Sequence, residues 1–372
     1  MRTLSLRALA AFAVVLAVVP TLQAEGVFEF TPVLVPNSNI EGFELAPPNT
    51  SNLGAFNIVI VPGPGLAGNP AALLAFNRAA DQWEARIYDP ITVTINANLG
   101  PLGAGIIGSA SGVFLQAGYN TIRDAVVADG AAAPAAENNG IVNSLPTLAQ
   151  FSAFVPAGGS VTANITVAKA NAKALGFAGL DGIFGVSDAT ITFSNTFAFD
   201  FDDSNGVGAG LLDFETTAAH EIGHVLGFFS AVDQADGGAV AMQATTLDLF
   251  RFRLLAANNP SNAAEFTTFP RNLRANSESV FDDLGTEYRM STGFATGDGR
   301  QASHWKDDIL LGSHIGIMDP TLSSGLAFPV IDSDFRALDL IGYNVVPEPT
   351  SLLLLAIAAV GCLTGLRRRI AK

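Results

Sequence analysis

The segment from Thr216 to Ser230, TTAAHEIGHVLGFFS, is the feature that most narrows what this chain can fold into. Two histidines in it, His220 and His224, are four residues apart, and Glu221 follows the first of them. In a helix of about 3.6 residues per turn, this spacing places both imidazoles on one face, where they can bind the same metal ion. The pattern HExxH is typical of zinc hydrolases in which the glutamate is the general base. The segment therefore predicts a metal-binding helix with Glu221 beside the metal.

A glycine, Gly227, lies three residues after His224 and extends the motif to HExxHxxGF. Glycine can adopt the left-handed conformation that ends a helix and turns the chain sharply. This motif resembles that of the metzincin zinc endopeptidases, in which the turn allows a third histidine to approach the metal. The commonest metzincins place that histidine three residues after the glycine, where this chain has Ser230. A third ligand is therefore expected elsewhere.

Two histidines remain in the chain, His304 and His314. Trp305 follows His304 directly, and a Gly-Ile-Met-Asp-Pro segment that contains Met318 comes about a dozen residues later. This order is similar to the leishmanolysin branch of the metzincins, where a long insertion precedes the third ligand. The resemblance implies that His304 is the third ligand and that Met318 lies beneath the metal. His314 is only the second choice, because it lies four residues before Met318 and would leave a very short connection.

Alternatives stay open at these positions. His304 is otherwise a surface histidine in a loop, and Met318 is otherwise a core methionine, as most methionines are. Asp233 and Asp248 are weaker candidates for the third ligand, because some related peptidases use a carboxylate there. Other metzincins have a tyrosine two residues after the methionine, whereas this chain has Pro320. No such tyrosine is therefore expected to assist catalysis.

The first 24 residues have the three parts of a secretory signal peptide. Arg2 and Arg7 precede an apolar run from Ala8 to Val19, and a short segment ending at Ala24 follows it. We expect cleavage near Ala24, so that residues 1–24 are removed. The alternative is an N-terminal membrane anchor, which is disfavoured because twelve apolar residues are short for a membrane span.

The C-terminal residues 347–372 are the second targeting signal. Pro347, Glu348 and Pro349 are followed by an apolar run from Leu352 to Leu366 and by three consecutive arginines. This arrangement resembles the PEP-CTERM sorting signal of Gram-negative bacteria. The resemblance implies an exosortase-like sorting peptidase as a partner, a short transmembrane segment as the only membrane contact, and export across the inner membrane to the envelope or the medium. A permanent C-terminal anchor is the alternative.

The region between the two signals, residues 25–346, is strongly acidic. The whole chain has 19 basic and 34 acidic residues, and the two terminal signals contain six of the basic residues and one of the acidic residues. Residues 25–346 therefore have 13 basic and 33 acidic residues, a net charge of −20. Such a surface repels nucleic acid and anionic membranes, so neither is an expected partner. The chain's one cysteine, Cys362, lies in the C-terminal apolar run. The acidic region therefore has no disulfide, and no cysteine can cover the metal as a latency device.

Apolar residues make up 49% of the chain, so a packed core is expected. We predict an α+β fold for residues 25–346: a metzincin-like upper subdomain at about 70–230 with a twisted mixed sheet and the metal helix, and a lower subdomain at 231–346 with the third ligand, the methionine turn and a C-terminal helix. Residues 25–54 are interpreted as a loosely organised lead-in with short strand-like pieces such as Val27 to Phe30. Predicted helices are 70–87, 121–127, 145–153, 165–175 and 334–341, and predicted strands are 57–61, 91–96, 189–193, 197–199 and 247–253.

Two further segments have a functional and a structural interpretation. Strands 189–193 and 197–199 precede the metal helix. The resemblance to metzincins implies that an edge strand in this position pairs with an extended substrate, but an ordinary inner strand is equally expected. Asp200, Asp202, Asp203 and Asn205 crowd one turn and offer oxygen ligands for a calcium ion, but an acidic surface turn is the favoured interpretation.

These features together predict an exported zinc endopeptidase that cleaves polypeptides. His220, His224 and His304 would hold one zinc ion, and Glu221 would take the proton of the attacking water. A non-catalytic envelope or biofilm matrix protein that keeps the fold is the alternative. A zinc hydrolase acting on a substrate other than a peptide is a third possibility.

Overall fold

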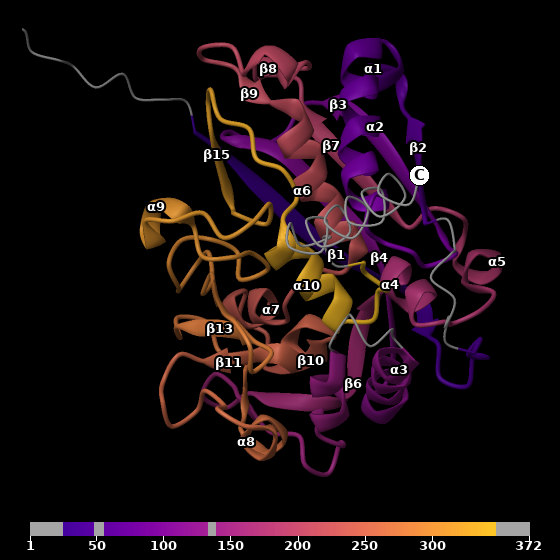
Figure 1. Ribbon diagram of the computed structural model, residues 1–372, viewed down its shortest axis with the longest axis vertical. Coiled ribbons are helices and arrows are strands. Elements are labelled where there is room, and N and C mark those ends of the chain that lie inside the picture. The colour runs from indigo at the N-terminus through magenta and orange to yellow at the C-terminus, as the bar shows by residue number, and fades with distance from the viewer. Residues whose placement is uncertain (1–24, 48–55, 133–138, 347–372) are drawn as a thin grey trace, which may run out of the picture.

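The computed structural model describes residues 25–47, 56–132 and 139–346. The predicted signal peptide, residues 1–24, and the predicted sorting segment, residues 347–372, lie outside these residues. The described residues form an α+β fold, as the sequence predicts, with helices and a large mixed sheet (Figure 1).

An eight-stranded mixed sheet carries most of the fold. The path β10-β6-β4-β7-β3-β2 gives the order of six strands, and β1 pairs with both β4 and β15. The strands are β1 (Glu25–Asn39), β2 (Asn57–Pro62), β3 (Thr92–Gly100), β4 (Ile106–Gly118), β6 (Ser160–Ala168), β7 (Ala189–Ser194), β10 (Ala241–Thr245) and β15 (Thr321–Ser323).

The long strand β4 is the centre of this sheet. On one side its first half pairs antiparallel with β7, and its second half pairs antiparallel with β6. Its other side pairs in parallel with β1. The far edge of β1 pairs antiparallel with β15, near the C-terminal end of the described chain. The first strand of the fold is therefore held between β4 and a late segment.

The helix that carries the HExxH motif, α6 (Phe214–Leu226), packs against α2 (Pro70–Glu84), and the two run side by side in the upper half of Figure 1. Trp83 of α2 donates a hydrogen bond from its indole nitrogen to the carbonyl of Ala219, 3.0 Å away. The other α-helices are α1 (Pro64–Ala67), α3 (Tyr119–Ala132), α4 (Lys169–Ala174), α5 (Leu180–Phe184), α7 (Val232–Asp236), α8 (Ala263–Thr268), α9 (Asp308–Leu311) and α10 (Asp332–Leu340). Short 3-10 turns are η1 (Asn139–Ser144), η2 (Asp203–Asn205) and η3 (Leu247–Phe250).

The interval between His224 and His304 is structured by small sheets. A three-stranded antiparallel sheet is made of β11 (Arg251–Arg253), β13 (Ser279–Asp282) and β14 (Glu287–Met290). Two pairs, β5 (Ala153–Phe154) with β12 (Arg271–Asn272) and β8 (Phe199–Asp200) with β9 (Leu212–Asp213), complete the strands of the described residues. The predicted strand 247–253 is wrong in its first half, because Leu247–Phe250 forms the 3-10 turn η3.

Several local predictions are confirmed and others are wrong. The strand at 57–61 and the helices at 70–87 and 334–341 are present as β2, α2 and α10, with ends shifted by up to three residues. The predicted helix at 145–153 is absent, because this segment forms turns and ends in β5. The helix expected at 165–175 begins only at Lys169, since the preceding residues pair with β4 as β6.

The two most consequential differences concern β1 and β7. The segment interpreted as a loose lead-in begins with the 15-residue strand β1. The strand expected as a possible substrate-binding edge, β7, lies between β3 and β4 and is an inner strand. The strand that lies against the metal helix α6 is instead β4. The edge of β4 that β7 and β6 leave free is paired with β1.

Candidate metal centre

Helix α6 has a capped beginning, and it ends at the glycine where the sequence predicts its end. The carboxylate of Asp213 accepts the backbone N–H of Thr216 at 2.7 Å and caps the first turn. Gly227 ends the helix in the left-handed conformation, with φ of +119°. Residues Thr216 to Leu226 are all buried, so the helix runs through the core. His220 and His224 therefore face each other one turn apart inside the protein.

The loop that carries His304 returns to this helix from a distance of about eighty residues. Asp233, just after the helix, accepts the backbone N–H groups of Ala302 and Ser303 at 2.6 and 3.0 Å. The hydroxyl of Ser303 in turn accepts the backbone N–H of Ser230 at 2.9 Å. The buried carboxylate of Asp233 thus fixes the residues directly before His304.

The three imidazoles point their Nε2 atoms at one common position. The Nε2 atoms of His220, His224 and His304 lie 3.1 Å from one another in all three pairs. Each Nδ1 lies against a backbone carbonyl, at 2.7 Å for Ile317, 2.8 Å for Phe228 and 3.1 Å for Gln301. A carbonyl only accepts, so each Nδ1 donates and each neutral ring presents the lone pair of Nε2 to the other two.

Three converging lone pairs fit a cation better than any other occupant. Tetrahedral ligands at about 2.0–2.1 Å from a zinc ion lie about 3.3 Å apart, which is close to the 3.1 Å observed. Burial, and for His220 and His224 also the neighbouring imidazoles, lowers the pKa of each ring, to about 4 for His304. The rings are therefore neutral at neutral pH, the form in which histidine binds metals. Three protein ligands leave a fourth position, as in catalytic zinc sites.

Glu221 is fully buried beside this cluster. Neither carboxylate oxygen has a hydrogen-bond partner of normal geometry in the described structure. Burial raises the pKa of Glu221 well above its usual value, the nearby carboxylate of Glu29 raises it further, and the backbone amide of Ala110 offsets this only in part. A Cβ at Gly108 of β4 would lie 2.4 Å from Oε1, so only glycine leaves room for this carboxylate.

The methionine turn lies under the helix. Met318 is fully buried, and its sulfur lies where a side chain at Gly223, between the two helix histidines, would have to be. The carboxylate of Asp334 accepts the backbone N–H of Ile317 at 2.9 Å and the indole N–H of Trp305 at 2.8 Å. Asp334 thus joins the turn to the residue after His304. Burial raises the pKa of Asp334 to about 6.

The alternative ligands do not join the cluster. Asp248 accepts the hydroxyl of Ser230 and the backbone N–H of Ala231, and Asp233 holds the His304 loop as described above. His314 lies with Asp308 and Asp319 in the second of two groups that could hold a metal among the described residues. Its ring is stacked on Phe328 with 4.0 Å between centroids. Sequence reasoning considered Asp233 and Asp248 as ligands and missed that Asp233 positions the His304 loop and that Asp248 fixes the segment directly after the metal helix.

The acidic turn is made of capping interactions. Asp200 accepts the backbone N–H groups of Asp202 and Gly208, and Asp202 accepts that of Ser204. These interactions surround the short turn η2 (Asp203–Asn205), in keeping with the acidic turn that the structural interpretation expected. The calcium site stays a prediction.

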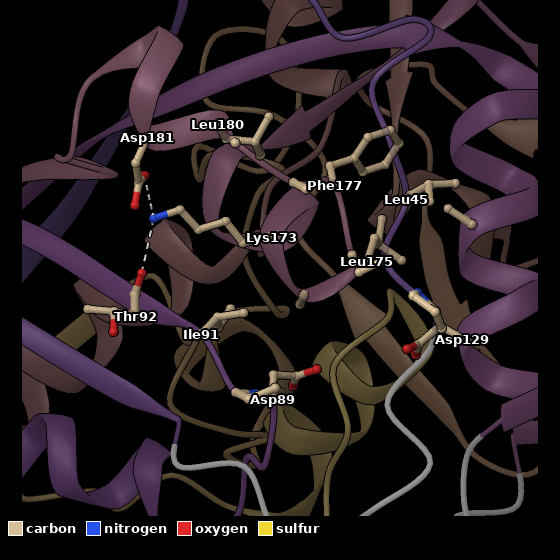
Figure 2. Close-up of a pocket in the computed structure, with 18 of the residues that line it drawn as sticks. Leu45, Asp89, Ile91, Thr92, Asp129, Lys173, Leu175, Phe177, Leu180 and Asp181 are labelled. Carbon is tan, nitrogen blue, oxygen red and sulfur yellow. Dashed lines mark hydrogen bonds and ion pairs between the residues drawn. The ribbon is translucent and has the colours of Figure 1, made fainter.

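A cavity of about 480 Å³ lies elsewhere, and none of the four histidines lines it. Figure 2 shows Lys173 at its wall, between Asp181 and the carbonyl of Thr92, with Asp89 and apolar side chains such as Phe177 around the space. The Lys173 ammonium makes ion pairs of 2.7 Å with Asp181 and 2.9 Å with the buried Asp188. We call this cavity the Lys173 pocket. Lys173 and these two carboxylates therefore compensate one another.

Comparison with known proteins addresses the C-terminal end. Residues 345–369 match the PEP-CTERM protein-sorting motif. This confirms the sorting signal that the sequence predicts, and such motifs mark proteins for export to the cell envelope of Gram-negative bacteria and for recognition by an exosortase-type sorting enzyme. No curated protein and no solved structure matches the chain. Within the described ranges, no helix is long and apolar enough to cross a membrane, and the predicted span from Leu352 to Leu366 lies outside them.

Proposed function

We propose that this chain is an exported zinc-dependent endopeptidase of metzincin type. The observation that carries the proposal is the group of three buried Nε2 atoms, 3.1 Å apart, with an unpaired carboxylate next to it. Three acceptors this close repel one another unless a cation lies between them. His220, His224 and His304 would hold that cation.

A zinc ion bound there would supply a Lewis acid that polarises a carbonyl and lowers the pKa of a water molecule to about 7. Glu221 would accept the proton of the attacking water on a carboxylate oxygen and later donate it to the leaving amine nitrogen. The positive charge of the ion would bring the raised pKa of this carboxyl back towards the range of a general base. Backbone groups of β4 would bind the substrate chain, in the manner by which an extended peptide joins a sheet edge.

The substitution Glu221→Gln tests the assignment, because it keeps the shape of the side chain and removes its basicity. Zinc-loaded protein with the native Glu221, once the strand that covers its metal centre has been removed as described below, should cleave an unfolded polypeptide such as denatured casein. The variant should bind zinc equally well and be slower by about 10²- to 10⁴-fold. Equal cleavage rates for the two proteins would remove the peptidase proposal.

The alternative is a non-catalytic envelope protein in which zinc is structural. Its supporting observation is that all three histidines are fully buried. Structural zinc sites, however, have four protein ligands as a rule, and only three imidazoles converge here. This alternative predicts that both proteins bind zinc and that neither cleaves any polypeptide, even after the metal centre has been uncovered.

A further inference from the structure

The cover over the histidines is the first strand of the fold. The ring of Phe28 is stacked on His220, with 3.7 Å between centroids and 13° between planes. The ring of Phe30 is stacked on His224, at 4.6 Å and 21°. Both phenylalanines are 3% exposed. The side chain between them, Glu29, is on the opposite, exposed face of β1, as the alternation of a strand requires.

This strand is hydrogen-bonded on both sides. Its register with β4 pairs Phe28 with Gly108 and Phe30 with Ala110. On the other side, the amide of Gln301 accepts the backbone N–H of Phe30 at 2.9 Å and donates to its carbonyl at 3.0 Å. The structure therefore contains a slot between β4 and the loop that carries His304, and main-chain groups of β1 fill it.

The slot leads past the groups that would do the chemistry. The Glu221 carboxylate lies against Gly108, and Gly108 is the register partner of Phe28. A chain lying where β1 lies thus brings its backbone past Glu221 and its side chain onto His220. A slot walled by main-chain donors and acceptors binds extended polypeptides of many sequences.

Two hollows continue the slot along the strand. One, of about 270 Å³, is lined by Val27 and Glu29 of β1 together with Ile106, Phe294 and Arg300. Another, of about 360 Å³, is lined by Pro32 and Leu34 together with Phe114 and Gln243. Open space therefore borders β1 at two places along its length.

We propose that the groove between β4 and residues 301–305 is the polypeptide-binding site of the enzyme and that β1 is a built-in inhibitory strand that occupies it. The inference rests on the proposed function. The occupant is the segment that directly follows the predicted signal-peptide cleavage site at Ala24, so a free N-terminus would lie at one end of the groove. The region between the two signals has no cysteine that could cover the metal. In this proposal Phe28 and Phe30 close the site instead, because their rings cover His220 and His224. A substrate reaches the metal centre only when β1 leaves.

The first test uses the double variant Phe28→Ala/Phe30→Ala of the chain that begins at Glu25. The matched control is Thr31→Ala/Val33→Ala, which changes two exposed side chains of the same strand. The two variants and the unsubstituted chain are loaded with zinc, and the rate at which a chelator removes the metal is measured with a colorimetric zinc indicator. We expect at least ten-fold faster removal from the phenylalanine variant and an unchanged rate from the control. Equal rates in all three proteins would overturn the proposal.

A second test keeps β1 intact during folding. A recognition sequence for a site-specific protease is inserted between Glu41 and Gly42, in an exposed turn after β1. The uncut preparation is the control. After cutting and gel filtration in mild denaturant, the shortened protein should release zinc faster and bind a synthetic peptide of residues 25–39. Loss of the strand, seen by mass spectrometry, without any change in zinc release would contradict the inference.

Cleavage of denatured casein separates the two proposals. Faster zinc release together with new casein cleavage supports both the inhibitory strand and the peptidase. Faster zinc release without cleavage, when peptide 25–39 still binds, keeps the covered groove but removes the peptidase. Cleavage by the uncut protein at the rate of the cut protein removes the inhibitory role alone.

Discussion

The histidine cluster and the region around the Lys173 pocket differ in whether their buried polar groups have partners of complementary charge. Behind the wall of the Lys173 pocket, the buried carboxylate of Asp188 lies 2.9 Å from the Lys173 ammonium and 3.3 Å from that of Lys169. In the histidine cluster, three lone pairs point at one another and both oxygens of Glu221 lack normal partners. The pocket is the more open space, whereas the cluster combines three converging lone pairs with a buried carboxylate and so offers a cation its ligands. The proposed function therefore rests on the cluster and not on the larger empty volume.

The largest expected effect is the response of stability to zinc. If the cluster binds zinc, then zinc at 1,000 times its dissociation constant should raise the free energy of unfolding of the metal-free wild-type protein by about 4 kcal/mol. The measurement is urea unfolding of metal-free protein with and without zinc. The increment should disappear in His220→Ala. A full increment in that variant would mean that the ion binds elsewhere.

The Lys173 pocket should respond to loss of its own cation. Lys173→Met keeps the length of the side chain and leaves Asp188 with Lys169 alone. We expect a loss of about 3 kcal/mol, the lower end of the range for breaking a buried ion pair, because one partner remains. Asp181→Asn is the control, since Asp181 is 44% exposed and its loss should cost under about 1 kcal/mol. The zinc increment should be unchanged in Lys173→Met, which would establish that the two regions are independent.

A smaller effect is expected from pH at the wall of the Lys173 pocket. Burial raises the pKa of Asp89 to about 7, although Asn344 donates two hydrogen bonds to this carboxylate. The folded chain thus binds a proton that the unfolded chain, with a carboxyl pKa of about 4, has released. The contribution of Asp89 to stability is present below pH 4 and is lost as the pH rises to 7, by at most about 1.4 kcal/mol per pH unit.

The check on this effect is urea unfolding at pH 5 and pH 7 for wild type and Asp89→Asn. The difference in stability between the two proteins should change in favour of the variant at the higher pH. A difference that is the same at both pH values would show that Asp89 is ionised in the folded protein at pH 5.

Sequence reasoning located the candidate ligands because they obey short-range rules. The four-residue spacing of His220 and His224 and the glycine at Gly227 act within one helix, and the structure has that helix with the expected end. His304 was reachable because the chain has only four histidines and a resemblance to choose among them. Strand 57–61 and helix 70–87 were likewise predictable from periodicity and from Pro70 in the first turn.

The groove was not predictable, because segments that are distant in the sequence form it and their residues are chosen for packing against each other. β4 contains Gly108 and Gly112, which count against a strand in any local reading. Gly108 makes room for Glu221, and a Cβ at Gly112 would lie 2.7 Å from the ring of Phe114. β1 contains Pro32 and Pro36, which also disfavour a strand, yet it pairs with a segment about eighty residues away. The strand and its inhibitory position follow only from that pairing.

The most direct test is the metal content of three proteins purified without added chelator and dialysed against zinc. Wild type and His314→Ala should each retain one zinc ion per chain, because His314 lies outside the cluster. His304→Ala should lose zinc affinity by at least 100-fold, because it removes one of three converging nitrogens. Full zinc retention by His304→Ala, or no zinc in the wild-type protein, would contradict the three-histidine metal centre.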